Sequence, residues 1–243
     1  MIDVSIIIPA YNEEQRISQT LRDYLIYFSS KKAEIIVVLN GCIDNTIDVV
    51  KTFQTQYPDL LKYIEISEAV GKGGAVQAGF KQAKGNIIGF VDADESTSPV
   101  EYDKLIHALP GNDGVIASRW LKKSIVKERT LLRKITSKLF VSLVKLFFNL
   151  PYHDTQCGAK VFTASAINKI LPQLEVKNMA FDVELLIACR ANDLKIKEVP
   201  TFWVDKTSSA LLGSKIKLIK SAILMFKTLI KIRKKNYGQK SHL

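Results

Sequence analysis

Two aspartates separated by one residue, Asp92 and Asp94, come directly after an apolar run that covers residues 86–91. Such a run is typical of a buried β-strand, and open α/β sheets bind ligands at the carboxyl ends of their strands. Two neighbouring carboxylates repel each other unless a cation lies between them. Oxygen ligands suit Mg²⁺ or Mn²⁺, which often bridge to phosphates. The segment Asp92-Ala93-Asp94 therefore indicates metal-assisted chemistry on a nucleotide diphosphate.

A second polar segment, residues 9–14, follows the apolar run 2–8. Tyr11 offers a ring that can stack on a nucleobase, and Glu13 can accept hydrogen bonds from a base or ribose. The alternative is that Asn12 caps the next helix, where the glutamates would favour the N-terminal end of the helix dipole. Both interpretations are compatible with one loop.

Two further loops are candidates for ligand contact. Asn40 follows the apolar run 34–39, and it either contacts a ligand or belongs to a turn before the next helix. Gly71 and Lys72 open a glycine-rich segment that lacks the spacing of a Walker loop. One lysine at a helix N-terminus can still favour an anion, although a simple tight turn is the alternative.

Short strands and helices alternate along the first half of the chain, which predicts βαβ units and a mostly parallel sheet. The expected strands are 2–8, 34–39, 60–66, 86–91 and 113–118, and the expected helices are 13–28, 44–57, 74–83 and one that begins at 98–99. The 243 residues suffice for one large core. We expect a catalytic domain over residues 1–205 and a basic tail over 206–243.

Positive charge is concentrated in two segments of the chain. The net charge of the whole chain is +11, that of residues 119–150 is +8 and that of residues 206–243 is +10. The rest of the chain therefore has a negative net charge. Lysines at helical spacing line one side of 131–150 and of 214–235, against apolar residues. A single helix of this kind commonly packs its apolar face on a sheet, but two favour contact with an anionic membrane surface. The pattern indicates no nucleic-acid partner.

The remaining features bound the location of the protein. The three cysteines are widely spaced and form no Cys-x-x-Cys pair, which fits a reduced cytosolic setting. No apolar run reaches the ~18 residues that a spanning helix requires. We therefore expect a cytoplasmic protein that is peripheral on the cytosolic face of a membrane.

Arg119 ends the last predicted strand, and Arg133 and Ser137 share one face of the basic helix. Arginine binds phosphate with bidentate geometry, so these residues could hold a lipid phosphate. Asp154 and Gln156 form another polar cluster, and Asp182 and Glu184 are typical of a helix N-terminus. No Ser–His–Asp arrangement is evident.

Taken together, these segments resemble glycosyltransferase family 2, and within it the polyprenyl-phosphate sugar synthases, the dolichyl-phosphate mannose and glucose synthase group. The resemblance covers nearly the whole chain and rests on the order and spacing of its motifs. The matching residues are 5–14, 71–76, 92–94, 117–119, 154–160, 181–184, 198–200 and 213–215.

The resemblance implies a GT-A fold, which is a Rossmann-like nucleotide-sugar fold, and a role for each site residue. Asp92 and Asp94 would hold Mg²⁺ or Mn²⁺ against the donor diphosphate. Asp154 and Gln156 would lie near the donor sugar or the acceptor as catalytic residues. The expected nucleotide-sugar contacts are Pro9, Ala10, Tyr11, Glu13, Asn40, Gly71, Lys72, Asp92 and Ala93, and the expected acceptor-phosphate contacts are Arg119, Arg133 and Ser137.

Two departures from the family pattern bear on the donor; the first leaves the base, UDP or GDP, open, and the second is nearer the glucose-synthase type. Many relatives carry Asp-Asp-Gly-Ser where this chain has Leu39-Asn40-Gly41-Cys42, and mannose synthases often carry Gln at the position of Ser96. The implied activity is inverting transfer of a hexose to a polyprenyl or dolichyl phosphate from a nucleotide sugar, for which UDP-hexose is favoured and GDP-mannose is the alternative. Some relatives have C-terminal membrane helices, so a membrane-protein partner is a further expectation.

Three alternatives stay open at this point. A family 2 enzyme could act on a glycan or another soluble acceptor, with Asp182 or Glu184 as the base. The chain could instead be a non-catalytic protein that binds a membrane surface. Nucleotidyl transfer on a similar fold would release pyrophosphate rather than a nucleoside diphosphate.

Overall fold

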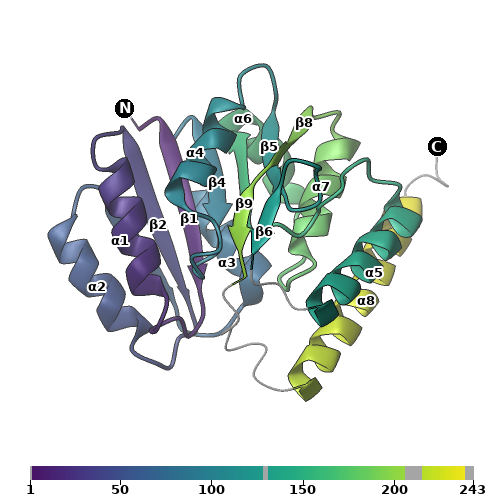
Figure 1. Ribbon diagram of the computed structural model, residues 1–243, viewed down its shortest axis with the longest axis horizontal. Coiled ribbons are helices and arrows are strands. Elements are labelled where there is room, and N and C mark those ends of the chain that lie inside the picture. Colours follow the sequence, from purple (N-terminus) through teal and green to yellow (C-terminus); the bar gives the residue numbers. More distant parts are fainter. Residues whose placement is uncertain (1, 128–130, 206–214, 239–243) are drawn as a thin grey trace.

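A seven-stranded sheet forms the centre of the computed structural model, which describes residues 2–127, 131–205 and 215–238 (Figure 1). The strand order is β3-β2-β1-β4-β7-β5-β8. The strands are β1 Val4–Ala10, β2 Ala33–Asn40, β3 Leu61–Ile66, β4 Ile87–Val91, β5 Gly114–Ser118, β7 Ala159–Thr163 and β8 Ile196–Pro200. β7 runs antiparallel to β4 and β5, and the other pairs in the sheet are parallel. The mixed, mostly parallel α/β architecture expected from the sequence is confirmed.

Helices cover both faces of this sheet (Figure 1). On one face lie α1 Ile17–Phe28, α2 Thr46–Gln56 and α4 Pro99–His107, and on the other lie α3 Gly71–Gln82, α6 Ala164–Ile170 with the 3₁₀ turn η1 Leu171–Gln173, and α7 Phe181–Ala191. Along β1, Ile6 and Ile8 enter the first core and Ile7 enters the second. Because both faces are buried, the central strands are continuous apolar runs rather than alternating ones.

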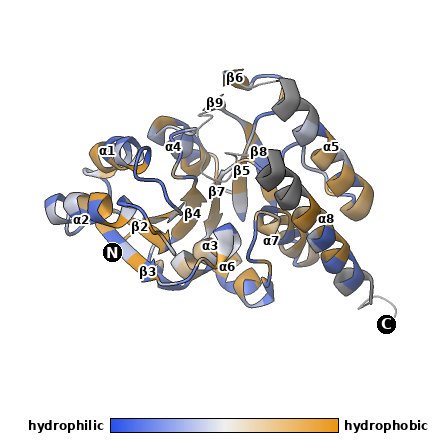
Figure 2. Ribbon diagram, turned by 90° about the horizontal axis from the view of Figure 1, so that it is seen from below, coloured by the Kyte–Doolittle hydropathy of each residue, from blue (hydrophilic) through white to orange (hydrophobic). Residues whose placement is uncertain are grey.

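Four elements lie outside this sandwich. A short parallel pair, β6 Ile125–Lys127 and β9 Phe202–Val204, forms a second sheet. Two long helices, α5 Leu131–Phe148 and α8 Lys215–Gly238, pack against each other at the α7 side of the molecule (Figures 1 and 2). The rings of Phe147 and Phe226 are 6.1 Å apart between these helices.

The apolar faces of α5 and α8 are only partly used in packing on the body. Val144, Leu229 and Ile232 are buried in the second core, and Asn178 Nδ2 donates to Thr228 Oγ1 at 2.9 Å. Leu146 nevertheless remains 74% exposed. Within the described ranges, neither of these helices nor any other combines the length and apolar character that crossing a bilayer would require. Packing on the second core and exposure of apolar side chains therefore coexist in this helix pair.

Some element boundaries differ from the prediction. The first helix begins at Ile17 rather than at residue 13, because the N–H groups of Arg16 and Ile17 both donate to the carbonyl of Glu13 and leave residues 13–16 in a separate turn. Asn12 is therefore no helix cap. It has a φ of 54° and accepts a hydrogen bond from the N–H of Ile43 at 2.9 Å. The third helix begins at Gly71 rather than Gly74, so Lys72 lies in its first turn.

Several elements are not predicted by the sequence pattern. β6 and β9 have only three residues each, too few for a periodicity to appear. The apolar run of β7 is interrupted by Lys160, and β8 and α6 have only five and seven residues. The predicted helix 131–150 is found as α5, and the predicted tail helix is found as α8. The proposed boundary between domain and tail adjoins residues 206–214, which lie outside the described part of the chain.

Candidate active site

A cavity of about 490 Å³ opens where β1, β2 and β4 end. It lies beside the β1–β4 contact, where the strand order changes direction, which is the usual ligand position in open α/β sheets. Its walls contain every residue predicted to contact the donor or the metal, namely Pro9, Ala10, Tyr11, Glu13, Asn40, Gly71, Lys72, Asp92, Ala93 and Asp94. Residues dispersed over 86 positions of sequence thus meet at one site.

Six other lining residues were not found by sequence reasoning. They are Arg16, Ala69, Asn178, Met179, Leu224 and Met225. Arg16 lies three residues after Glu13 and could have been suspected from that spacing. Leu224 and Met225 belong to α8, and no local signal connects that helix to a loop more than 120 residues earlier.

The loops after β1 and β2 are joined by hydrogen bonds. The N–H of Glu13 donates to Thr46 Oγ1 at 2.8 Å, and the N–H of Asn45 donates to Glu14 Oε2 at 3.0 Å. Asn40 is buried, and its Oδ1 accepts from the N–H of Val70 at 2.7 Å. Asn40 therefore fixes the approach to Gly71 and Lys72, in addition to lining the cavity.

Glu13 has an unusual electrostatic environment. Burial raises its pKa to about 7, although the guanidinium of Arg16, which contacts its carboxylate, opposes this shift. The negative charges of Asp94 and Asp92 raise the pKa further. A carboxyl group that gains its charge near neutral pH thus faces the metal-binding candidates across the cavity.

The two aspartates after β4 differ in their partners. Lys72 Nζ lies 2.8 Å from Asp92 Oδ1, whereas Asp94 Oδ1 accepts from the N–H of Ser96 at 3.0 Å. Gly158 makes room for Asp92, since a Cβ there would lie 1.8 Å from Asp92 Oδ2. Burial raises the pKa of Asp92, against the effect of Lys72.

The carboxylate oxygens of Asp92 and Asp94 suit a hard cation that phosphate oxygens also coordinate. Among the described residues, no group of three or more His, Cys, Asp or Glu side chains lies close enough to hold a metal. Mg²⁺ and Mn²⁺ sites at phosphates commonly use one or two carboxylates, with water and phosphate oxygens completing the shell. Two carboxylates in a cavity therefore fit such an ion in company with a diphosphate.

Asp182 and Glu184 lie in the first turn of α7, as the sequence predicts. Burial would raise the pKa of Asp182, but the ammonium groups of Lys160 and Lys72 outweigh burial and hold that pKa below its usual value. Glu184 Oε2 accepts from the N–H groups of Glu175 and Val176 at 3.0 and 2.8 Å. Both carboxylates are thus engaged with the protein itself, which makes them poor general bases.

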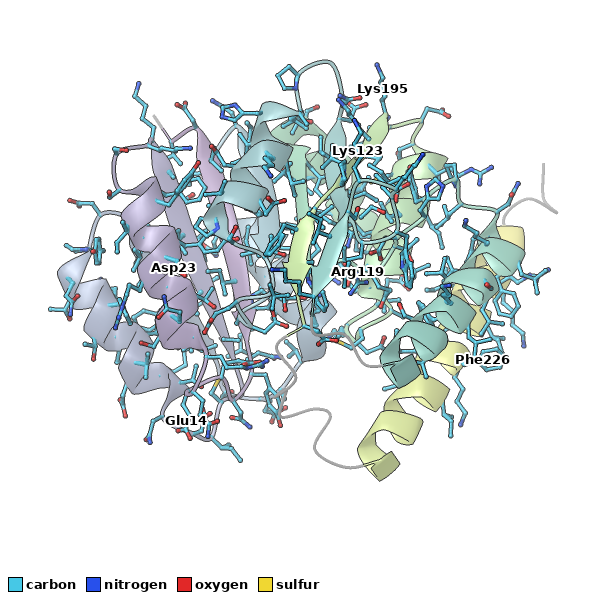
Figure 3. All side chains as sticks on the ribbon, in the orientation of Figure 1. Glu14, Asp23, Arg119, Lys123, Lys195 and Phe226 are labelled. Atoms are coloured by element: carbon cyan, nitrogen blue, oxygen red, sulfur yellow. The ribbon has the colours of Figure 1, made fainter. Side chains whose placement is uncertain are left out.

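Arg119 at the end of β5 and Asp154 before β7 form a bidentate ion pair (Figure 3 labels Arg119). The Nε–Oδ2 distance is 2.7 Å, and the N–H of Arg119 also donates to Oδ2 at 3.0 Å. Asp154 is fully buried, accepts from the N–H of Gln156, and donates its own N–H to Glu198 Oε1. The guanidinium lies 5.1 Å from the Trp203 ring. Asp154 therefore orients Arg119 in this state.

The other predicted acceptor residues lie on α5. Ser137 is half-buried, while the side chain of Arg133 lies outside the described part of the structure. Lys138 Nζ lies 5.7 Å from the ring of Trp120, the neighbour of Arg119. This contact brings the first half of α5 next to the end of β5, although no described contact joins Ser137 to Arg119.

Comparisons with known proteins agree with this geometry. Residues 5–171 match the family model described as "Glycosyl transferase family 2". A Drosophila melanogaster protein named dolichyl-phosphate beta-glucosyltransferase is 36% identical over 86% of this chain and 69% of its own length. The Saccharomyces cerevisiae protein of the same name is 32% identical over 92% of this chain and 74% of its own length.

Solved structures show the same fold. Glucosyl-3-phosphoglycerate synthase from Mycobacterium tuberculosis, in a complex with Mn²⁺, UDP and glucosyl-3-phosphoglycerate, has a TM-score of 0.73. It is 16% identical, and the match covers 98% of this chain and 80% of that one. At this identity the likeness concerns the fold alone, and it confirms the expected GT-A fold.

We predict that Glu13 makes folding stability depend on pH near neutrality. A carboxyl whose pKa is raised by folding stabilises the protein fully below its unfolded value of 4.5, and that contribution is lost as the pH rises through about 7. Between pH 4.5 and 8, the free energy of unfolding of the unchanged protein should fall relative to that of Glu13→Gln, by on the order of 1–3 kcal/mol. Urea denaturation at several pH values measures this difference. Parallel pH profiles for the two proteins would contradict the prediction.

Proposed function

We propose, from the premise that this chain belongs to glycosyl transferase family 2, that it transfers glucose from UDP-glucose to the phosphate of a polyprenyl lipid, with inversion at the anomeric carbon. Membership of the family makes the chain a glycosyltransferase rather than a non-catalytic binding protein. One observation carries the proposal: all ten residues expected around a metal and a nucleotide sugar line the same cavity.

The choice of donor rests on relatives and on one position after the aspartate pair. Curated relatives at 30–36% identity are named for glucosyl transfer to dolichyl phosphate. Ser96 follows the aspartate pair at the position where mannose synthases often carry Gln. These features favour UDP-glucose over GDP-mannose as the donor.

Asp92 and Asp94 would hold Mg²⁺ or Mn²⁺ in this proposal. When bound, such an ion neutralises the negative charge that develops on the departing nucleoside diphosphate. Lys72 adds a positive charge on the same wall of the cavity, next to Asp92. Tyr11 and Glu13 would contact the nucleoside at the end of the cavity formed by the loops after β1 and β2.

The state of Asp182 and Glu184, the two carboxylates expected as possible bases, supports a phosphate acceptor. A hydroxyl acceptor needs a general base, but Asp182 is buried between two lysines and Glu184 is bound to backbone N–H groups. A phosphate monoester with a second pKa near ~6 is largely ionised at neutral pH and can attack without a base. Single displacement by its oxygen breaks the bond from the sugar to the diphosphate and inverts that carbon. Arg119, Arg133 and Ser137 would orient this phosphate.

Contact with a membrane surface is supported by α5 and α8. Leu139, Ile223 and Phe226 are exposed apolar residues on these helices, among exposed lysines such as Lys138 and Lys227. Phe226 lies on the side of the helix pair away from the sheet (Figure 3). Apolar side chains surrounded by lysines suit the interface of an anionic bilayer, where a polyprenyl phosphate resides. Attachment at the cytosolic face and a membrane-protein partner belong to the same proposal.

The function is tested by incubating the protein with UDP- and GDP-sugars, MnCl₂ or MgCl₂, and a short polyprenyl phosphate in vesicles. Lipid-dependent release of UDP from UDP-glucose, with glucosyl phospholipid as product, is the expected result. Equal transfer to a soluble glycan without lipid would show a different acceptor. Release of pyrophosphate would show nucleotidyl transfer.

We predict that Asp94→Ala lowers turnover at least ~100-fold, because the diphosphate would leave without charge neutralisation. The exposed Asp59→Ala, which removes a carboxylate remote from the cavity, serves as the control. The melting temperatures of both variants should match that of the unchanged protein. Full activity of Asp94→Ala at saturating MgCl₂ would remove this residue from the metal site.

We predict that Arg133→Glu raises the KM for polyprenyl phosphate ~10-fold or more while leaving UDP affinity within about twofold, since repulsion would act on the acceptor phosphate. Lys145→Glu, the same reversal of charge near the other end of α5, should change the KM far less. Steady-state kinetics and calorimetry with UDP separate the two effects. Equal losses of acceptor use and UDP affinity would point to a damaged fold.

We predict that Ile223→Glu reduces binding to vesicles that contain anionic lipid, by roughly tenfold, because an apolar group would be replaced by a repelled charge. Ile26→Glu on α1 is the matched control, since Ile26 is 62% exposed and Ile223 is 50% exposed. Vesicle sedimentation measures the bound fraction. If both variants bind as the unchanged protein does, α8 is no membrane contact.

A further inference from the structure

Lys160 is a fully buried lysine at the centre of the sheet. It lies in β7, and its ammonium donates to Asp182 Oδ1 at 2.5 Å and to the carbonyl of Cys157 at 2.6 Å. Burying a charge is unfavourable even when it is paired, and a well-packed apolar residue commonly serves stability as well. Stability alone therefore gives little reason for a lysine at this position.

The ion pair of Lys160 is the first of a series that leads to the cavity. Asp182, itself buried, contacts Lys160 through Oδ1 and Lys72 through Oδ2, the latter at 3.3 Å. Lys72 Nζ in turn lies 2.8 Å from Asp92 Oδ1. The four side chains alternate in charge and connect the interior of the sheet to the metal-binding candidate.

The ring of Phe90 lies close to both lysines of this series. The ammonium of Lys160 lies 5.3 Å from its centroid and that of Lys72 lies 5.5 Å from it. Asp182 is therefore shared between two cations that an aromatic face also attracts. Because Lys160 occupies one oxygen of Asp182 at the shorter distance, Lys72 is left balanced between Asp182 and Asp92.

We infer that Lys160 and Asp182 are positioning residues, which act through Lys72 to set how strongly its ammonium occupies Asp92 and how it is presented to the donor diphosphate. This inference rests on the proposed function, because it assumes that Asp92 receives a divalent cation and that the cavity receives UDP. A cation held by Asp92 would compete with the ammonium of Lys72 for that carboxylate, and Asp182 would keep the ammonium beside the cavity.

The sign of each substitution follows from this series of charges. Without Lys160, the whole charge of Asp182 attracts Lys72, so Asp92 becomes freer for a cation while Lys72 is drawn away from the diphosphate. With Asp182→Asn, Lys72 loses its second partner and pairs fully with Asp92, in competition with the cation. Lys72→Met removes the competing ammonium and makes any action of Lys160 through it impossible.

The experiment measures two affinities in the full chain. Binding of MnCl₂ without nucleotide is followed by the electron paramagnetic resonance signal of free Mn²⁺, and binding of UDP by calorimetry in the presence of MnCl₂. Lys160→Met should bind Mn²⁺ about tenfold more tightly and UDP about tenfold more weakly than the unchanged protein, and Asp182→Asn should bind Mn²⁺ about tenfold more weakly. Lys160→Met should add no further change in the Lys72→Met background.

The control for charge alone is Lys177→Met, the same change at an exposed lysine beside the start of α3. It should leave both affinities within about twofold, because solvent screens exposed charges. An equal effect of Lys160→Met with and without Lys72 would show a general electrostatic influence and overturn the inference. So would unchanged affinities in both Lys160→Met and Asp182→Asn.

The outcomes separate this inference from the function on which it rests. If the unchanged protein binds Mn²⁺ and UDP, and Lys160→Met and Asp182→Asn bind both with the same affinities as the unchanged protein, the positioning role is wrong and the donor site stands. If the unchanged protein binds neither Mn²⁺ nor UDP, the proposed donor site is wrong and the positioning role falls with it. Should Lys160→Met fail to fold, Asp182→Asn still tests the inference, because the inference predicts that this variant binds Mn²⁺ more weakly than the unchanged protein.

Discussion

The parallel contact between β1 and β4 is the constraint on which the site depends. It pairs Ile7 with Phe90, and both strands then end at the same edge of the sheet. The loop that carries Tyr11 and Glu13 thereby faces the loop that carries Asp92 and Asp94, although some 80 residues separate them. β2 runs parallel to β1, so its end at Asn40 lies at the same edge, and the first turn of α3 adds Gly71 and Lys72 there. A different strand order would distribute these residues over separate surfaces.

Charge compensation is the second property that this edge must satisfy. Glu13, Asp92, Asp94 and Asp182 bring four carboxylates close to one cavity, and isolated carboxylates would be strongly disfavoured there. Lys72, Lys160 and Arg16 supply cations at ion-pair distance. Glu13 nevertheless retains a raised pKa, so compensation is incomplete without ligands. In the proposed function, a bound cation and diphosphate would complete the compensation of these charges.

α8 links this cavity to the outer surface of the protein. Leu224 and Met225 contribute to the cavity wall, and Leu224, Ile223 and Phe226 are all exposed apolar residues. The helix is joined to the body through Thr228 and through the buried side chains of Leu229 and Ile232. α8 therefore contributes to the cavity wall and also presents apolar side chains at the surface of the protein. In the proposed function, this one helix would adjoin both the donor and the membrane.

Local patterns in the sequence determined much of this protein. Continuous apolar runs predicted the buried parallel strands, and helical spacing of lysines predicted α5 and α8, because these signals depend on neighbours within a few residues. Polar residues at strand ends predicted the cavity wall, since all parallel strands of one sheet end at one edge. The family resemblance, carried by motif order, extended this to the fold and the reaction class.

Only the tertiary structure decided the partners of the charged groups. Asp154 orients Arg119 across 35 residues, Lys160 pairs with Asp182 inside the sheet, and Leu224 reaches the cavity from α8. β7 lies antiparallel between β4 and β5, and this placement makes possible the contacts of Asp154 with Arg119 and of Lys160 with Asp182. No local periodicity in the sequence predicts this placement. An ion pair depends on which distant segments pack together, and that is settled by the global arrangement of strands rather than by spacing along the chain.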